Sequence, residues 1–135
     1  VVEKSIIGEG ASIFGKVYNS VIGCGVTIGE NTVVSDSVIM THAVIGKDGE
    51  IHKAIIAEHA KIGDRVKMGI GEPKENEEFP HIYAQDIVTV GEKSFIPDDI
   101  TIGKNTVIFG ETIQEDYEGL TLPSGKSLIK AGDWA

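Results

Sequence analysis

The chain has 135 residues, and its 12 Lys and Arg against 21 Asp and Glu give a formal net charge of −9. The basic residues are scattered, which excludes the cationic footprint of a nucleic-acid-binding protein. No apolar run approaches the roughly 20 residues of a membrane-spanning helix, and no signal-peptide pattern opens the chain. With one cysteine, Cys24, which fits a reduced thiol, the sequence predicts a single soluble cytoplasmic domain.

A ladder of aliphatic residues recurs every five or six positions. Its central members are Ile22, Ile28, Val34, Ile39, Ile45, Ile51, Ile56, Ile62 and Met68. Three steps span 17 residues, so every third member falls in one column. The residues two positions earlier, which share a strand face with the ladder, are all small or β-branched. Hexapeptide repeats of this kind predict an all-β fold, a parallel β-helix shaped as a triangular prism.

Residues 1–69 are predicted to form the first coils. The ladder begins at Ile7 and Ile13, but the next two steps, to Val17 and Ile22, are only four and five residues long. One corner of the first coil must therefore be tighter than the others. The ladder also starts without a polar cap, and solenoids need caps at their open ends. We therefore expect the chain to be a fragment that lacks a preceding N-terminal domain.

Two segments interrupt the repeat. Residues 70–86 contain two prolines and an acidic run, and should form a loop that projects from one corner. Further coils are predicted over 87–109, where the ladder resumes at Val90, Ile96, Ile102 and Ile108. Over 110–135 the regular step is lost. We predict a hairpin around Pro123 there that caps the prism, with Trp134 as a packing residue.

Two histidines are separated by one full coil. His42 and His59 are 17 residues apart and each follows a ladder residue by three positions, so they should stack outward roughly 4.8 Å apart. Hexapeptide carbonic anhydrases hold zinc with three stacked histidines. A catalytic zinc usually needs three protein ligands, whereas His52 directly follows a ladder residue on another corner and His81 is in the insertion. The residues therefore predict a solvated pair and no metal site.

Several segments resemble the C-terminal prism of ADP-glucose pyrophosphorylase (glucose-1-phosphate adenylyltransferase). Residues 19–40, NSVIGCGVTIGENTVVSDSVIM, have its Ile-Gly corners. The Ile-Gly-Glu corner at 70–72, the acidic loop after it and the IVTV strand at 87–90 follow the order of the bacterial enzymes. The segment IPDDITI at 96–102 has the shape of the next plant hexapeptide. The resemblance covers residues 5 to about 108 and implies left-handed coiling.

The resemblance implies a parent nucleotidyltransferase that makes ADP-glucose and pyrophosphate from ATP and glucose 1-phosphate for glycogen synthesis. In that family an N-terminal domain supplies the catalytic residues and the Mg²⁺ ligands, so no catalytic residue and no cofactor is assigned to this chain. The prism would pack on its own catalytic domain, contribute to a homo- or hetero-oligomer such as a tetramer, and help to bind sugar-phosphate or nucleotide effectors. It could come from a catalytic or a paralogous regulatory subunit.

The candidate effector-binding residues are Lys93, His59 and Arg65. In the plant-type enzymes an activator-binding lysine follows the strand that matches 87–90, and here that position is Glu92, with Lys93 next to it. A carboxylate repels a phosphate ester, whereas a lysine can hold it as a point charge. Either Lys93 substitutes through a shifted corner or the protein is regulated differently.

Two other functional classes remain open from the residues alone. One is an enzyme with its active site on the prism, either a hexapeptide acyltransferase with a histidine base or a carbonic-anhydrase-like protein. The other is a scaffold without a ligand, in which the acidic residues of the loop are simply solvated.

Overall fold

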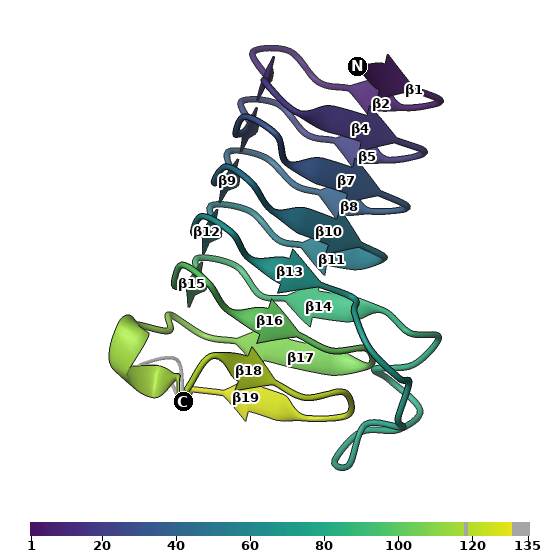
Figure 1. The fold of residues 1–135 in the computed structure, drawn as a ribbon, viewed down its shortest axis with the longest axis vertical. Helices are drawn as coiled ribbons and strands as arrows, with labels where there is room; N and C mark the ends of the chain where they lie inside the picture. The colour runs from purple at the N-terminus through teal and green to yellow at the C-terminus, as the bar shows by residue number, and fades with distance from the viewer. Residues whose placement is uncertain (118, 131–135) are drawn as a thin grey trace.

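The computed structural model describes residues 1–117 and 119–130, which form short parallel strands wound into a three-sided prism (Figure 1). Sheet A contains β1 (Val2–Glu3), β4 (Lys16–Tyr18), β7 (Val33–Ser35), β10 (Glu50–His52), β13 (Lys67–Met68), β16 (Thr101–Ile102) and β18 (Thr121–Leu122). Sheet B contains β2 (Ile6–Ile7), β5 (Val21–Ile22), β8 (Val38–Ile39), β11 (Ala54–Ile56), β14 (Val88–Val90), β17 (Thr106–Phe109) and β19 (Ser127–Ile129). Sheet C contains β3 (Ser12–Ile13), β6 (Thr27–Ile28), β9 (Val44–Ile45), β12 (Lys61–Ile62) and β15 (Phe95–Ile96).

The aliphatic ladder forms the core, as the sequence predicts. Ile22 pairs with Ile39 and Ile39 with Ile56 in sheet B, and the ladder residues from Val17 to Ile108 are buried. Aliphatic residues stack on aliphatic residues in each column, because successive coils pair in the same register. The parallel β-helix is thus confirmed, and the stack is consistent with the left-handed hexapeptide-repeat form.

The small companion residues have a second role at the corner between sheets A and B. The Ser20 hydroxyl accepts a hydrogen bond from the backbone N–H of Ser37 (3.1 Å), and the Ser37 hydroxyl accepts one from Ala54 N–H (3.1 Å). Both serines are buried. An unpaired buried N–H is costly, so this hydroxyl ladder stabilises the turn between two faces.

The first coil has the tight corner that the short steps predict. Ile13 pairs with Ile28, a separation of 15 residues, where later coils have 17. Only Phe14 and Gly15 join β3 to β4. Gly15 is buried, and a Cβ there would collide with the backbone carbonyl oxygen of Thr32 in the next coil. Glycine is therefore required by the close approach of two backbones.

The insertion, residues 70–86, contains no strand, as predicted, and lies outside the prism between β13 and β14 (Figure 1). It does not simply project into solvent. It runs along the edge of the prism beside the later coils, and its Asn76 is buried. The ladder keeps its phase across the insertion, because Ile62 pairs with Ile96, 34 residues or two coil lengths away.

The predicted capping hairpin is wrong. β18 pairs in parallel with β16, and β19 pairs in parallel with β17, so the tail adds another coil. The reason is that Leu122 and Leu128 are six residues apart and continue the ladder in sheets A and B. Residues 118 and 131–135, and with them the expected packing of Trp134, lie outside the described residues. No helix in the described part of the chain could span a bilayer.

Candidate functional site

The corner between sheets B and C places one residue with a left-handed backbone in each of the five coils that contribute a strand to sheet C. These residues, with φ between +58° and +74°, are Gly10, Gly25, His42, His59 and Lys93. The N–H of His59 donates to Thr41 O (3.1 Å), and the N–H of Lys93 donates to Glu58 O (3.0 Å). His42, His59 and Lys93 therefore lie on three successive coils. Two of the three predicted effector residues, His59 and Lys93, therefore share one corner.

His42 and His59 stack as their spacing predicts. Their ring centroids are 5.4 Å apart and their planes differ by 25°. The same backbone conformation at both positions sends both side chains outward on the same path. On the other side of His42, a Cβ at Gly25 would collide with the imidazole ring. Gly25 therefore leaves room for the His42 ring on the side away from His59.

The histidine stack does not have the geometry of a shared metal site. The lone pair of an imidazole nitrogen lies in the ring plane, so nearly parallel rings direct their nitrogens sideways rather than toward one ion. Within residues 1–117 and 119–130, no three His, Cys, Asp or Glu side chains gather as a metal-binding group. We assign no metal ligand to this corner.

Two carboxylates lie next to His59 and Lys93 at this corner. Glu58 and Glu92 directly precede His59 and Lys93, and all four residues are exposed. Two potential cations thus alternate with two acids on neighbouring coils. An anion bound by Lys93 would meet the charge of Glu92 from the adjacent residue, and this repulsion is strongest when salt does not screen it.

Arg65, the third predicted effector residue, lies on a different corner, between sheets C and A. Its Nε and one terminal nitrogen donate to the two carboxylate oxygens of Asp99 (2.6 and 3.3 Å). The hydrogen bond with Asp99 raises the pKa of Arg65, and the same bond lowers the pKa of Asp99. An anion at Arg65 would therefore compete with Asp99, and the structure does not bring Arg65 to the Lys93 corner.

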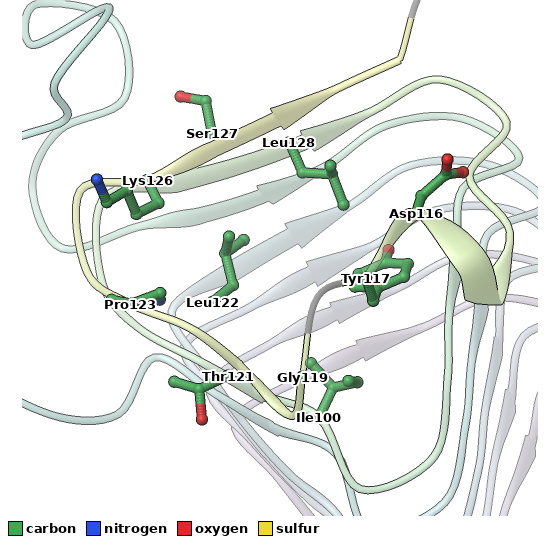
Figure 2. Close-up of a pocket in the computed structure, with 10 residues that line it drawn as sticks. All are labelled: Ile100, Asp116, Tyr117, Gly119, Thr121, Leu122, Pro123, Lys126, Ser127 and Leu128. Atoms are coloured by element: carbon green, nitrogen blue, oxygen red, sulfur yellow. The ribbon is translucent and has the colours of Figure 1, made fainter.

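An apolar cavity of about 380 Å³ opens at the C-terminal end of the prism (Figure 2). Ile100, Leu122, Leu128 and Tyr117 surround it, with Lys126 at its rim. The Tyr117 hydroxyl donates to the Phe95 carbonyl (2.6 Å), and burial raises its pKa to about 12. A second groove of about 590 Å³ lies between residues 70–74 of the insertion and residues 121–124.

Sequence reasoning missed the residues around this cavity. The step of six from Leu122 to Leu128 is a ladder signal, but the link from Ile108 to Leu122 is 14 residues long and hides it. The short 3₁₀ helix η1 (Gln114–Asp116) lies within that link, on the side where sheet C has no further strand.

The outward face of sheet B carries an aliphatic stripe near the N-terminal end. Ile6, Val21, Val38 and Ile55 are register neighbours on successive strands. Ile6 is 69 % exposed and Val38 is 37 % exposed. Contiguous exposed apolar residues on a soluble protein often mark a surface that packs on another protein or domain.

The repeating coils and the six-residue ladder define the chain as a hexapeptide-repeat β-helix protein. The family model described as GlmU-like, C-terminal hexapeptide matches residues 1–90. The chain belongs to this family.

Curated relatives match almost the whole chain and are glucose-1-phosphate adenylyltransferases, which confirms the resemblance. The chain is 54 % identical over 132 residues to the one from Lachnospira eligens and 45 % identical over 132 residues to the one from Acetivibrio thermocellus, in each case over 98 % of the chain. The relative from Thermotoga maritima is 50 % identical over 128 residues, 95 % of the chain. The chain spans only about 30 % of the length of these relatives.

Proposed function

We propose that this chain is the regulatory and assembly prism of a glucose-1-phosphate adenylyltransferase, an enzyme that forms ADP-glucose and pyrophosphate from ATP and glucose 1-phosphate for glycogen synthesis. The observation that carries the proposal is the identity of 45 to 54 % to relatives with that name across nearly the whole chain. The Mg²⁺ and the catalytic residues of the reaction would belong to a nucleotidyltransferase domain in the cytoplasmic parent protein.

The direct test is an assay of the full-length protein that contains this chain. Purified protein is incubated with ATP, Mg²⁺ and glucose 1-phosphate, and ADP-glucose and pyrophosphate are quantified. We expect both products in equal amounts, either from this polypeptide alone or together with a catalytic partner subunit if it is the regulatory paralogue. Absence of both products in each arrangement would contradict the proposal.

The aliphatic stripe of sheet B supports packing of the prism on its own catalytic domain or on another subunit. The exposed side chains of Ile6, Val21 and Val38 form one apolar strip, and burial of such area in an interface is favourable. Strands are spaced by roughly 4.8 Å, so the strip is long enough to receive one helix or strand of a neighbouring domain.

Val38→Lys is expected to weaken this packing, because a lysine in the centre of an apolar interface must be desolvated. In the full-length protein we expect a shift toward smaller species in size-exclusion chromatography with light scattering, or a loss of ADP-glucose synthesis of about tenfold. Val44→Lys is the matched control, since Val44 is similarly exposed but lies on sheet C. Equal behaviour of the two variants would rule out sheet B as the packing face.

The corner that carries His59 and Lys93 is the proposed contact for a phosphate-bearing effector. The two side chains lie on neighbouring coils of one corner and are exposed, so both can reach the same anion. Glu92 weakens such a site through its charge. An effector can act only through different affinities for two states of the enzyme.

Glu92→Lys is expected to strengthen the response to a sugar bisphosphate by about tenfold, because it replaces a repelling charge with an attracting one at an exposed position. The measurement is the effector concentration for half-maximal change in ADP-glucose synthesis. Glu30→Lys changes the net charge equally on another corner and serves as the control. The same shift in both variants would indicate a general charge effect and no site at this corner.

A further inference from the structure

The insertion contains one buried side chain among exposed neighbours. Asn76 is 2 % exposed, whereas residues 71–75 and 77–82 are exposed. Its amide nitrogen donates to the Asn105 carbonyl (3.0 Å) and to the Ser127 hydroxyl (3.1 Å). Its amide oxygen accepts from the backbone N–H groups of Glu78 (3.0 Å) and Phe79 (2.8 Å). The amide nitrogen therefore attaches the loop to the prism, and the amide oxygen fixes the turn of the loop itself.

Asn105 holds the insertion from the side of the prism. It is a corner residue with φ of +56°, and its side-chain nitrogen donates to the Lys74 carbonyl (3.0 Å). Its side-chain oxygen accepts from the backbone N–H of Asp86 (2.7 Å). One residue therefore contacts both the beginning and the end of the loop.

A second group of contacts joins the loop to the turn between β18 and β19. The N–H of Glu77 donates to the Gly125 carbonyl (2.9 Å), and the Glu77 carboxylate pairs with Lys126 (2.6 Å). Gly125 has φ of +82°, and a Cβ there would collide with the Glu75 carbonyl oxygen. The two backbones are thus in direct contact.

The coil that receives these contacts, residues 120–130, is the last coil within the described part of the chain. It contributes β18 to sheet A and β19 to sheet B, and within residues 1–117 and 119–130 no sheet C strand follows β15. In a solenoid each coil is supported by its neighbours, so contacts from the loop add to the support that this coil receives from β16 and β17. This coil pairs with the coil before it through β18 with β16 and β19 with β17, and the loop contacts add an attachment at the corner between those two strands.

We propose that residues 74–79 of the insertion are a latch that holds the coil 120–130 in register, so that the insertion and this coil open and close as one cooperative unit. When the latch is docked, Asn76 and Glu77 secure the coil. When it leaves, the coil loses its support on that corner, and Leu122 and Leu128 at the end of the prism become accessible. Regions of low local stability open in cooperative units of this kind while the rest of the protein stays folded. By reciprocity, whatever stabilises the docked loop also stabilises the closed end.

Hydrogen exchange measured by mass spectrometry on the full-length protein tests the coupling. Asn76→Ala removes the contacts of the Asn76 side chain, including the one to Ser127, and leaves the sequence of residues 120–130 unchanged. We expect amide exchange to become about tenfold faster in peptides from both 70–86 and 120–130, with no change in peptides from 33–56. Glu75→Ala is the control, because Glu75 is exposed in the same loop, and it should leave both regions protected.

The reciprocal variant, Ser127→Ala, removes a contact from the side of the coil and should speed exchange in the insertion peptides severalfold. If Asn76→Ala unfolds the whole protein, so that exchange is fast in all peptides, Ser127→Ala still tests the coupling between the two regions. Faster exchange confined to the insertion in Asn76→Ala would overturn the proposal, and so would unchanged insertion peptides in Ser127→Ala. Faster exchange of both regions in either variant supports a single unit.

Discussion

Replacing Ile45 with aspartate is expected to unfold the coils around it. Ile45 is 2 % exposed at the centre of the sheet C column, between Ile28 and Ile62. The variant removes a packed aliphatic side chain and buries a carboxylate without a partner, at a combined cost on the order of 5 kcal/mol or more. This is comparable with the whole stability of a typical domain. Because each coil supports the next, the disruption should spread along the stack.

Thermal unfolding followed by circular dichroism measures this effect. The matched control is Val44→Asp, one residue earlier on the same strand, where the side chain is 41 % exposed and points outward. We expect the control to unfold within a few degrees of the parent protein, since surface substitutions usually change stability by less than about 0.5 kcal/mol. A near-normal midpoint for Ile45→Asp would contradict the inward direction of the ladder.

Gly15→Ala is expected to dislodge the first coil. The added Cβ would collide with the Thr32 carbonyl, which belongs to backbone and cannot rotate away as a side chain can. Overpacking of this kind typically costs about 1–3 kcal/mol, and we expect the upper end here. The penalty should fall on residues 1–18, because the clash lies at the corner between β3 and β4 of this coil.

Limited proteolysis with mass analysis detects this local change, as new cleavage within residues 1–18 at unchanged protection of the central coils. Phe14→Ala alters the same corner at an exposed side chain and introduces no clash, so it should remain resistant. Equal resistance of the two variants would show that this corner can widen at little cost.

The parts of the fold that depend on local repetition were predictable. The columns of Ile22, Ile39 and Ile56, the tight first corner and the stacked histidines all follow from residue spacing, because each coil repeats the geometry of the one before. The final coil was not predictable in the same way, since its two ladder leucines are separated from Ile108 by an irregular link. In the sequence, two short strands that carry one ladder residue each fit a hairpin as well as they fit a coil.

The candidate site was predictable in part, for a similar reason. Lys93 follows His59 by two coil lengths, which places them on one corner, whereas Arg65 follows His59 by six residues and so belongs to the next corner. The ion pair of Arg65 with Asp99 depends on stacking across the insertion. The burial of Asn76 had no local signal, because its partner Ser127 is 51 residues away in the chain.

The phase of the ladder across the insertion suggests how this loop is related to the repeat. Ile62 and Ile96 are two coil lengths apart, and the 17 residues from 70 to 86 equal one coil. The insertion thus has the length of one coil but contains no strand. Its removal would leave Met68 and Val90 five residues apart, which is the spacing of consecutive strands within a coil. A chain of this design can exchange a structural repeat for a loop with contacts of its own without disturbing the order of the others.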